Sequence, residues 1–272
     1  MLRTIRRSGT MTWLSLLAGA VLAIPPAALA SGIGSPAQSD QNKMTEEIQK
    51  KLDGKQYKDV KATVEDGVAT LTGSVDLYEY KADADRKAHK VKGVKAVRND
   101  IEVSGQSVSD QELQQKLQQK LSYDRVGYGT TTFNAITVSV QNGEVTLGGH
   151  CYDYADRNSA LALVSTTPGV KDVNDEIQVD PPSPMDDQIR MAVARSVYGY
   201  PSLNKYAIDP AKPIRISVQN GHVSLYGVVD SKADRDVANL RANQVPGVFS
   251  VKNYLQVAGQ QGDQEKSQSS QK

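Results

Sequence analysis

The sequence predicts an α+β protein built from three tandem small modules, each with the element order α-β-β-α-β. Each module is expected to form a three-stranded mixed sheet packed on two helices. Two observations lead to this fold class: a strand–turn–strand pattern occurs three times along the chain, and a helix-like pattern lies before and after each copy. Repetition at a fixed period indicates a repeat architecture, so the three copies are expected to share one fold.

The repeated element is a β-hairpin, and it is clearest in the third copy. Apolar and polar residues alternate over 214–218 and again over 223–229, which is typical of strands with one buried face. Between them, Asn220-Gly221 tolerates the two positive φ angles of a type I′ turn, and this turn puts the apolar residues of both strands on one face. The corresponding turn glycines are Gly67, Gly143 and Gly221, which are 76 and 78 residues apart.

A helix is expected before each hairpin, because apolar residues recur there at i, i+4 spacing. These residues are Ile48 and Leu52 in the first copy, Leu113, Leu117 and Leu121 in the second, and Ile189, Val193 and Val197 in the third. Ser109 with Glu112, and Ser183 with Asp186, are typical of helix N-caps and predict where the second and third of these helices begin.

A second helix and a third strand are expected after each hairpin. Small residues at i, i+4 spacing, such as Ala84 with Ala88, allow a helix to lie close to a sheet. We expect three glycines of the preceding strand to receive this helix, and three later glycines to end it. The receiving glycines are Gly73, Gly149 and Gly227, and the terminating ones are Gly93, Gly169 and Gly247.

The ends of the chain differ from the modules in composition. Residues 1–30 combine arginines, a short apolar run and an Ala-x-Ala site, which predicts a signal peptide cleaved near Ala30 and a periplasmic protein. Residues 31–42 are expected to be a polar linker, and 259–272 a disordered polar tail. The modules between them are expected at 43–105 (module one), 106–180 (module two) and 181–258 (module three), close together because the linkers are short.

Composition argues against several functions. The formal charge is +1, and about −2 without the three signal arginines, so no global field favours nucleic acid. Cys151 is the single cysteine and takes the place of a strand valine, which predicts a buried, unpaired thiol. No metal-ligand spacing and no P-loop or G-x-S-x-G motif occurs, so we expect no enzyme, no metal and no cofactor.

The strand, turn and helix pattern of the copies resembles the BON domain. Module three matches it best, from Asn220-Gly221-His222-Val223 through Gly227 to Gly247-Val248 and Asn253, and module two departs with Cys151 and Asp175. The resemblance implies a non-catalytic envelope module that contacts phospholipid membranes or envelope proteins. OsmY-like members of the family act in osmotic-stress protection and have a chaperone-like role toward exported proteins.

Two loops are candidate contact surfaces, because the connection from the first helix to the hairpin is longer in modules two and three than in module one. Exposed loop aromatics are enriched at interfaces with proteins and with lipid headgroups. The alternative is that these rings cover the core of their own module or fill the contact between modules. The candidates are Tyr123, Tyr128 and Phe133 in module two, and Tyr198, Tyr200 and Tyr206 in module three.

Two further sets of polar residues have both a binding and a structural interpretation. Arg157 and Arg235 lie near the start of the second helix, where a cation suits a phosphate, or they pair with Asp153 and Asp230. Asn99, Asp175 and Asn253 lie on the apolar face of the third strand, where they contact a ligand or tie down loop backbone.

We therefore expect a periplasmic binding or stress-protective protein, which contacts an anionic membrane surface or exported client proteins through tandem modules. The alternative is a structural envelope adaptor that binds cell wall or a secretion assembly. The sequence leaves the oligomeric state open.

Overall fold

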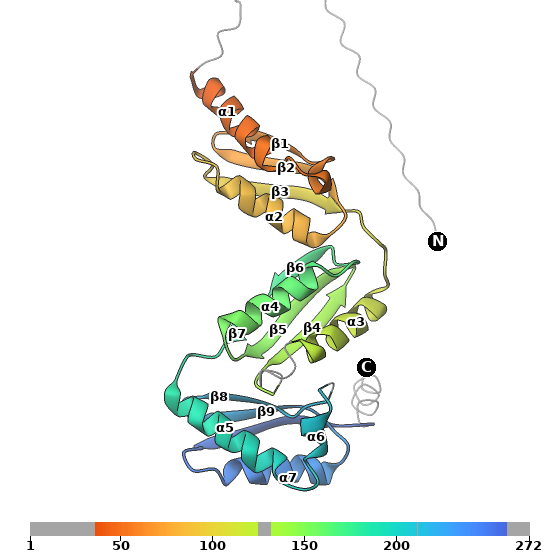
Figure 1. The fold of residues 1–272 in the computed structure, drawn as a ribbon, viewed down its shortest axis with the longest axis vertical. Coiled ribbons are helices and arrows are strands. Elements are labelled where there is room, and N and C mark those ends of the chain that lie inside the picture. Colours follow the sequence, from red (N-terminus) through yellow and green to blue (C-terminus); the bar gives the residue numbers. More distant parts are fainter. Residues whose placement is uncertain (1–35, 125–131, 211, 260–272) are drawn as a thin grey trace, which may run out of the picture.

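The computed structural model describes residues 36–124, 132–210 and 212–259. The expected signal peptide, residues 31–35 of the expected linker, Tyr128 and nearly all of the expected tail lie outside these residues. Within them, three α+β modules follow one another along the long axis of the molecule (Figure 1). None of the described helices is long and apolar enough to cross a membrane.

The three modules repeat the predicted order of elements. Module one consists of α1 (Pro36–Lys51), a 3-10 turn η1 (Lys55–Tyr57), β1 (Lys61–Glu65), β2 (Val68–Val75), α2 (Tyr78–His89) and β3 (Ala96–Val103). Module two consists of α3 (Asp110–Tyr123), β4 (Ala135–Gln141), β5 (Glu144–Cys151), α4 (Tyr154–Ser165), β6 (Asp172–Asp175) and β7 (Gln178–Val179). Module three consists of α5 (Pro184–Tyr198), α6 (Lys205–Ile208), β8 (Arg215–Gln219), β9 (His222–Val229), α7 (Lys232–Asn243) and β10 (Ser250–Val257).

Each sheet is mixed, with the second strand of the hairpin at its centre. The hairpin is antiparallel and the third strand runs parallel to the central one, because the second helix carries the chain back across the sheet. The predicted register is confirmed, since Ile216 pairs with Leu225 and Val218 with Val223. Asn220 and Gly221 have φ angles of 51° and 75°, as a type I′ turn requires.

The apolar face of each sheet packs on its two helices and forms a separate core. The residues predicted to face inward from the first helix are buried, among them Ile48, Leu113 and Val193, except Leu121, which is half-buried. Ser109 and Ser183 accept a backbone N–H bond at the start of α3 and α5, as expected for N-caps. The predicted fold class is therefore confirmed, with one core per module.

Two expectations about the glycines are wrong. Gly149 has a φ of +83°, and a Cβ there would lie 2.1 Å from the carbonyl oxygen of Ala135 in β4. The glycine is therefore needed for the close approach of two strand backbones, not to receive α4. In module one, α2 ends at His89 and Gly93 lies in the loop four residues later.

The boundary of the first helix also differs from the expectation. α1 begins at Pro36, inside the segment expected to be a linker. The first twelve residues of this helix carry few apolar side chains, so the periodic apolar pattern gives no signal until Ile48.

Candidate functional site

Tyr206, one of the candidate contact residues, is buried in module three. Its hydroxyl donates a hydrogen bond to Asp234 Oδ2 at 2.8 Å and accepts one from the Asp230 backbone N–H at 2.7 Å. Burial raises the pKa of this tyrosine, so the hydroxyl stays protonated and can donate. Tyr206 therefore joins the long loop to the start of α7, which is the structural alternative for this residue.

Tyr198 is also turned into module three. Its hydroxyl donates to the carbonyl oxygen of Ile214, and burial raises its pKa to about 12. The ring packs against the module-three core at the end of α5. Like Tyr206, it offers little surface to a partner.

Phe133 lies between modules two and three. Although it belongs to module two, its half-buried ring packs against the core of module three. The ring centroids of Phe133 and Tyr152 are 6.1 Å apart, and the Arg190 guanidinium lies 5.9 Å from the centroid of Phe133. This ring therefore fills the contact between two modules.

Only two of the described candidate aromatics remain exposed. Tyr123 at the end of α3 is 52% exposed and Tyr200 after α5 is 38% exposed. The Arg241 guanidinium lies 5.8 Å from the centroid of the Tyr200 ring, a cation–π geometry. The structure does not bring these two side chains together into one surface, and Tyr128 lies outside the described residues.

Arg157 and Arg235 are not paired as expected. Arg157 forms an ion pair with Asp175 Oδ2 at 2.5 Å, not with Asp153, and Arg235 lies 3.5 Å from Asp236, not beside Asp230. In both cases the cation has an acidic neighbour, which lowers its value as a phosphate site.

The polar residue on the third strand of each module explains why Arg157 pairs with Asp175. Asn99 donates its amide to the Lys81 carbonyl oxygen at 2.9 Å, and Asn253 does the same to Arg235 at 2.9 Å. An ionised aspartate cannot donate, so Asp175 takes the Arg157 side chain as its partner instead. These residues tie the second helix to the third strand, so their role is structural, although the backbone they bind is helical and not the expected loop.

Module one has a tyrosine that the sequence analysis did not single out. The Tyr57 ring is buried, its hydroxyl donates to Asp83 Oδ2 at 2.5 Å, and Lys87 Nζ lies 4.4 Å from the ring centroid. Tyr57 thus joins the loop to the second helix, as Tyr206 does in module three. The only sequence feature that could have indicated this role is the position of Tyr57 between the first helix and the hairpin.

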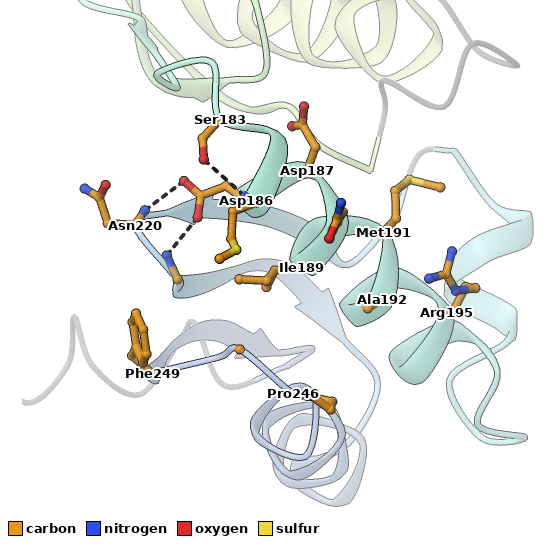
Figure 2. Close-up of a pocket in the computed structure, with 14 residues that line it drawn as sticks. Ser183, Asp186, Asp187, Ile189, Met191, Ala192, Arg195, Asn220, Pro246 and Phe249 are labelled. Carbon is orange, nitrogen blue, oxygen red and sulfur yellow. Dashed lines mark hydrogen bonds between the residues drawn. The ribbon is translucent and has the colours of Figure 1, made fainter.

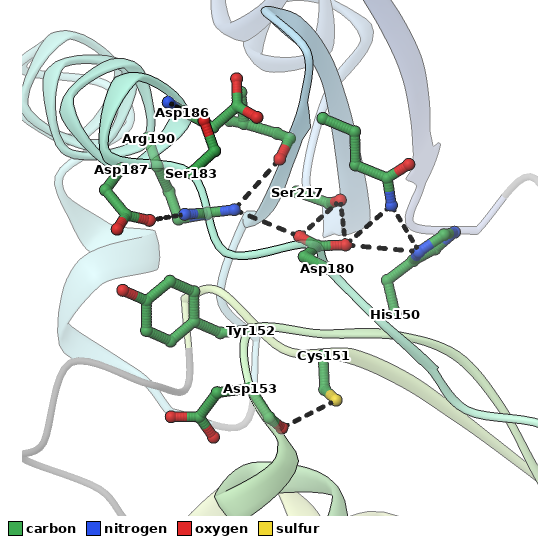
Figure 3. Close-up of polar contacts among 12 residues, drawn as sticks. His150, Cys151, Tyr152, Asp153, Asp180, Ser183, Asp186, Asp187, Arg190 and Ser217 are labelled. Atoms are coloured by element: carbon green, nitrogen blue, oxygen red, sulfur yellow. Dashed lines mark hydrogen bonds and ion pairs between the residues drawn. The ribbon is translucent and has the colours of Figure 1, made fainter.

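Modules two and three share a buried polar network centred on Asp180 (Figure 3). Asp180 and Arg190 are each 2% exposed, and Arg190 Nη2 lies 3.3 Å from Asp180 Oδ2. Ser217 and Gln219 of β8 donate to the same carboxylate at 3.1 and 2.9 Å, and His150 Nδ1 of β5 lies 3.6 Å from it. The short linker is therefore itself part of the interface.

The free edge of β8 is covered by module two. The Ile216 backbone N–H donates to the Thr132 carbonyl oxygen at 2.7 Å, and Arg215 donates to the Asn134 carbonyl oxygen at 2.6 Å. Because module two covers this edge and Ser217 on the outer face of β8 is also buried, modules two and three are closely packed.

The exposed apolar side chains are distributed very unevenly among the modules. Of the large apolar side chains described as exposed, one lies in module one, two lie in module two and eight lie in module three. The eight are Met185, Met191, Tyr200, Ile208, Val228, Leu240, Phe249 and Tyr254. Module three therefore offers most of the apolar contact surface, which the repeat pattern did not predict.

Part of this surface lines a groove of about 1000 Å³ on module three (Figure 2). α5 contributes Ile189, Met191 and Ala192, and the loop before β10 contributes Pro246 and Phe249. The groove is open to solvent and most of its surface is apolar, but Asp186, Asp187 and Arg195 also line it.

The remaining chemistry in the described residues is limited. The Cys151 side chain is fully buried, its thiol donates to the Asp153 carbonyl oxygen, and burial raises its pKa to about 12 (Figure 3). A thiol of this kind is a poor nucleophile at neutral pH. Residues 36–124, 132–210 and 212–259 contain no group of three or more His, Cys, Asp or Glu side chains placed to hold a metal ion.

The fold thus defines a class of proteins, chains of tandem α-β-β-α-β modules with a mixed sheet on two helices. The BON domain model matches residues 40–105, 109–181 and 186–259, and the chain belongs to the BON-domain family. The resemblance of the sequence to this family is confirmed.

Among curated proteins, osmotically-inducible protein Y of Escherichia coli (strain K12) is 31% identical over 131 residues. The match covers 44% of this chain and 60% of that protein, so the chain spans less than two thirds of this relative.

Two solved structures are distant matches. One is CdsD, a structural protein of the type III secretion system of Chlamydia trachomatis, with 17% identity, 83% of this chain, 97% of that chain and a TM-score of 0.24. The other is the periplasmic domain of PrgH, a type III secretion inner membrane protein from S. typhimurium, with 12% identity, 76% of this chain, 97% of that chain and a TM-score of 0.20. These similarities are too low to bear on function.

Proposed function

We propose that this chain is a non-catalytic, stress-protective binding protein of the periplasm, and that module three makes its contacts. The observation that carries the proposal is the concentration of exposed apolar side chains on module three. Three of these side chains, Met185, Met191 and Phe249, line one groove, and contiguous exposed apolar surface is typical of a protein or membrane interaction site.

Two further observations support the proposed compartment and the proposed role in stress. Residues 1–30 have the pattern of a secretory signal peptide, and the similar E. coli protein is osmotically inducible. A protein that is exported under osmotic stress meets two kinds of apolar partner, the membrane surface and exported proteins that have not yet folded.

Modules one and two support this surface rather than duplicate it. Module two is joined to module three through the buried carboxylate of Asp180, which fixes the position of α5 and β8. Module one contributes a single exposed large apolar residue, Val68. The proposal therefore narrows the expected contact through tandem modules to one contact module, which is held in place by module two.

Two assays of the chain from residue 31 onward test the proposal. The first is co-sedimentation with vesicles of phosphatidylethanolamine and phosphatidylglycerol at low and high salt. The second is light scattering from an unfolded, reduced test protein, whose aggregation a binding protein suppresses. We expect activity in at least one assay, and binding in neither would overturn the proposed function.

A matched pair of variants tests the role of module three. Phe249→Ser removes its most exposed aromatic ring, and Val68→Ser makes a similar change on module one. Both substitutions are exposed and are expected to change stability by only about 0.5 kcal/mol. We expect only Phe249→Ser to weaken binding, and equal activity of the two variants would contradict the role of module three.

A further inference from the structure

We propose that the groove on module three binds an aliphatic side chain from an extended segment of another protein. This inference rests on the proposed function and names the partner and the place of contact. It comes from comparing the same position in the three modules.

In module one this position is filled by the chain itself. Met44 lies four residues before the core residue Ile48, and its side chain packs against the core. A Cβ at Gly93 would lie 2.7 Å from Met44 Sδ, so the thioether covers this glycine directly. The first helix of module one thus closes the gap beside the loop that precedes its third strand.

In module two a valine has the same role. Val108 lies just before α3 and packs against the module-two core. A Cβ at Gly169 would lie 3.0 Å from Val108 Cγ2. An apolar side chain therefore covers the equivalent glycine in each of the first two modules.

In module three, among the described residues, only the core residue Ile189 approaches a Cβ at the equivalent Gly247, and no side chain before it in the chain does so. Met185 lies four residues before Ile189, as Met44 does before Ile48, yet its side chain is 68% exposed. The nearest atoms to a Cβ at Gly247 are those of Ile189, which belongs to the core, at 3.3 Å. The groove extends over Gly247, the position that a Met or a Val covers in the other modules.

The frame of the groove is held rigidly. The Asp186 carboxylate accepts hydrogen bonds from the backbone N–H groups of Asn220 and Gly221 at 2.9 and 2.8 Å (Figure 2). Ser183 caps α5, and Arg190 joins the same helix to Asp180. The helix, the turn and the linker therefore fix the groove before any partner arrives, which lowers the cost of binding.

The walls of the groove are adaptable, in contrast to its frame. Met191 is 48% exposed and Met185 more so, and unbranched thioether side chains adjust to apolar groups of different shape. Phe249, 78% exposed, adds a flat ring beside Gly221. A surface with these properties accepts many aliphatic side chains without selecting one sequence.

The charge at the rim favours a polypeptide over an anionic membrane. The charged residues that line the groove are Asp186, Asp187 and Arg195, so its carboxylates outnumber its cations and the lining does not attract lipid phosphate. The tail at 259–272 is not the occupant, because it contains no aliphatic or aromatic residue. A neutral or basic extended segment with aliphatic side chains fits both the groove and its rim.

Methionine methyl NMR tests the inference on the chain from residue 31 onward. This chain has three native methionines, of which Met185 and Met191 line the groove and Met44 is its covered counterpart. The probe is a synthetic peptide with alternating leucine and serine and with lysine at both ends. We expect the methyl signals of Met185 and Met191 to shift during titration, and the methyl signal of Met44 to remain unshifted.

Control measurements identify the occupant. A peptide with serine in place of every leucine is expected to cause no shift, and Phe249→Ser to weaken binding of the leucine peptide at least tenfold. Leu240→Ser, a change in an exposed side chain of α7 outside the groove, is expected to leave affinity within about twofold.

Four results would overturn the inference. They are shifts caused by vesicles and not by the peptide, shifts that depend on protein concentration alone, an equal effect of both substitutions, and peptide binding without shifts of Met185 and Met191. In the last case the proposed function stands and only the groove is excluded as the binding site. A chain that binds neither client protein nor vesicles would contradict both the proposed function and the groove inference.

Discussion

The two junctions between modules differ far more than the modules themselves. Between modules two and three, the buried Asp180 carboxylate accepts hydrogen bonds from Arg190, Ser217 and Gln219. Between modules one and two, Lys81 Nζ reaches the exposed Asp172 at 3.5 Å and Tyr78 packs against the module-two core. The three modules thus share one fold, but the two junctions do not share their contacts. The rigidity of each junction therefore depends on its own contacts and not on the repeat.

The largest expected effect comes from breaking the buried ion pair. Arg190→Ala leaves Asp180 buried without its cation, and removal of one partner of such a pair costs about 3–5 kcal/mol. Urea unfolding should show this loss. Arg195→Ala, an exposed change on the same helix, is the control and should cost less than about 0.5 kcal/mol. Similar losses in both variants would remove the special role of the Asp180 network.

The second largest effect is expected from a substitution in module two, close to the junction with module three. Gly149→Val combines a positive φ with a collision against Ala135, whose neighbour Asn134 accepts a hydrogen bond from Arg215. Each of these two costs is about 1–3 kcal/mol, and we expect a loss of about 2–3 kcal/mol in thermal unfolding. Gly148→Ala is the control, because Gly148 has no positive φ. An unchanged melting temperature for Gly149→Val would contradict the backbone contact.

A smaller effect is expected when the network loses a donor but keeps its charges. Ser217→Ala removes one of the donors to the buried Asp180 carboxylate, and a lost hydrogen bond to a charged group costs about 1.5–3 kcal/mol. Because Gln219 and Arg190 remain, we expect the lower end of this range in urea unfolding. The control is Ser139→Ala on the exposed face of β4. A loss as large as that of Arg190→Ala would show that the hydroxyl matters as much as the cation.

The smallest effect is expected at the other junction. Lys81→Ala removes the pair with Asp172, whose carboxylate is exposed, and such surface pairs contribute about 0–1 kcal/mol. Unfolding should hardly change, while limited proteolysis of the 104–109 linker is expected to remain as fast as in the unmodified chain. A large loss of stability would mean that the two junctions are more alike than their contacts indicate.

The repeated parts of the structure were predictable because their causes are local. The apolar spacing of Ile189, Val193 and Val197 identifies the buried face of a helix. Asn220-Gly221 specifies the turn of the following β-hairpin without any distant contact. The BON-like pattern in module three therefore predicts the fold as well as the strand register.

The candidate site was not predictable in the same way, because its features depend on distant partners. Tyr206 and Tyr200 look alike in the sequence, yet one is buried beside Asp234 and the other is exposed. Met44 and Met185 occupy the same sequence position, and only the packing around them shows that one covers its module and the other does not. Spacing along the chain carries no information on such contacts.

The burial of Cys151 has a consequence for the redox behaviour of the chain. Burial raises its pKa to about 12, so very little of the thiol is ionised at neutral pH, and the thiolate is the form that forms disulfides. In an oxidising compartment the folded chain therefore keeps its thiol reduced without help from a reductant. Unfolding exposes the thiol and lowers its pKa, so disulfide-linked dimers of this single-cysteine chain would record how often molecules have unfolded under stress.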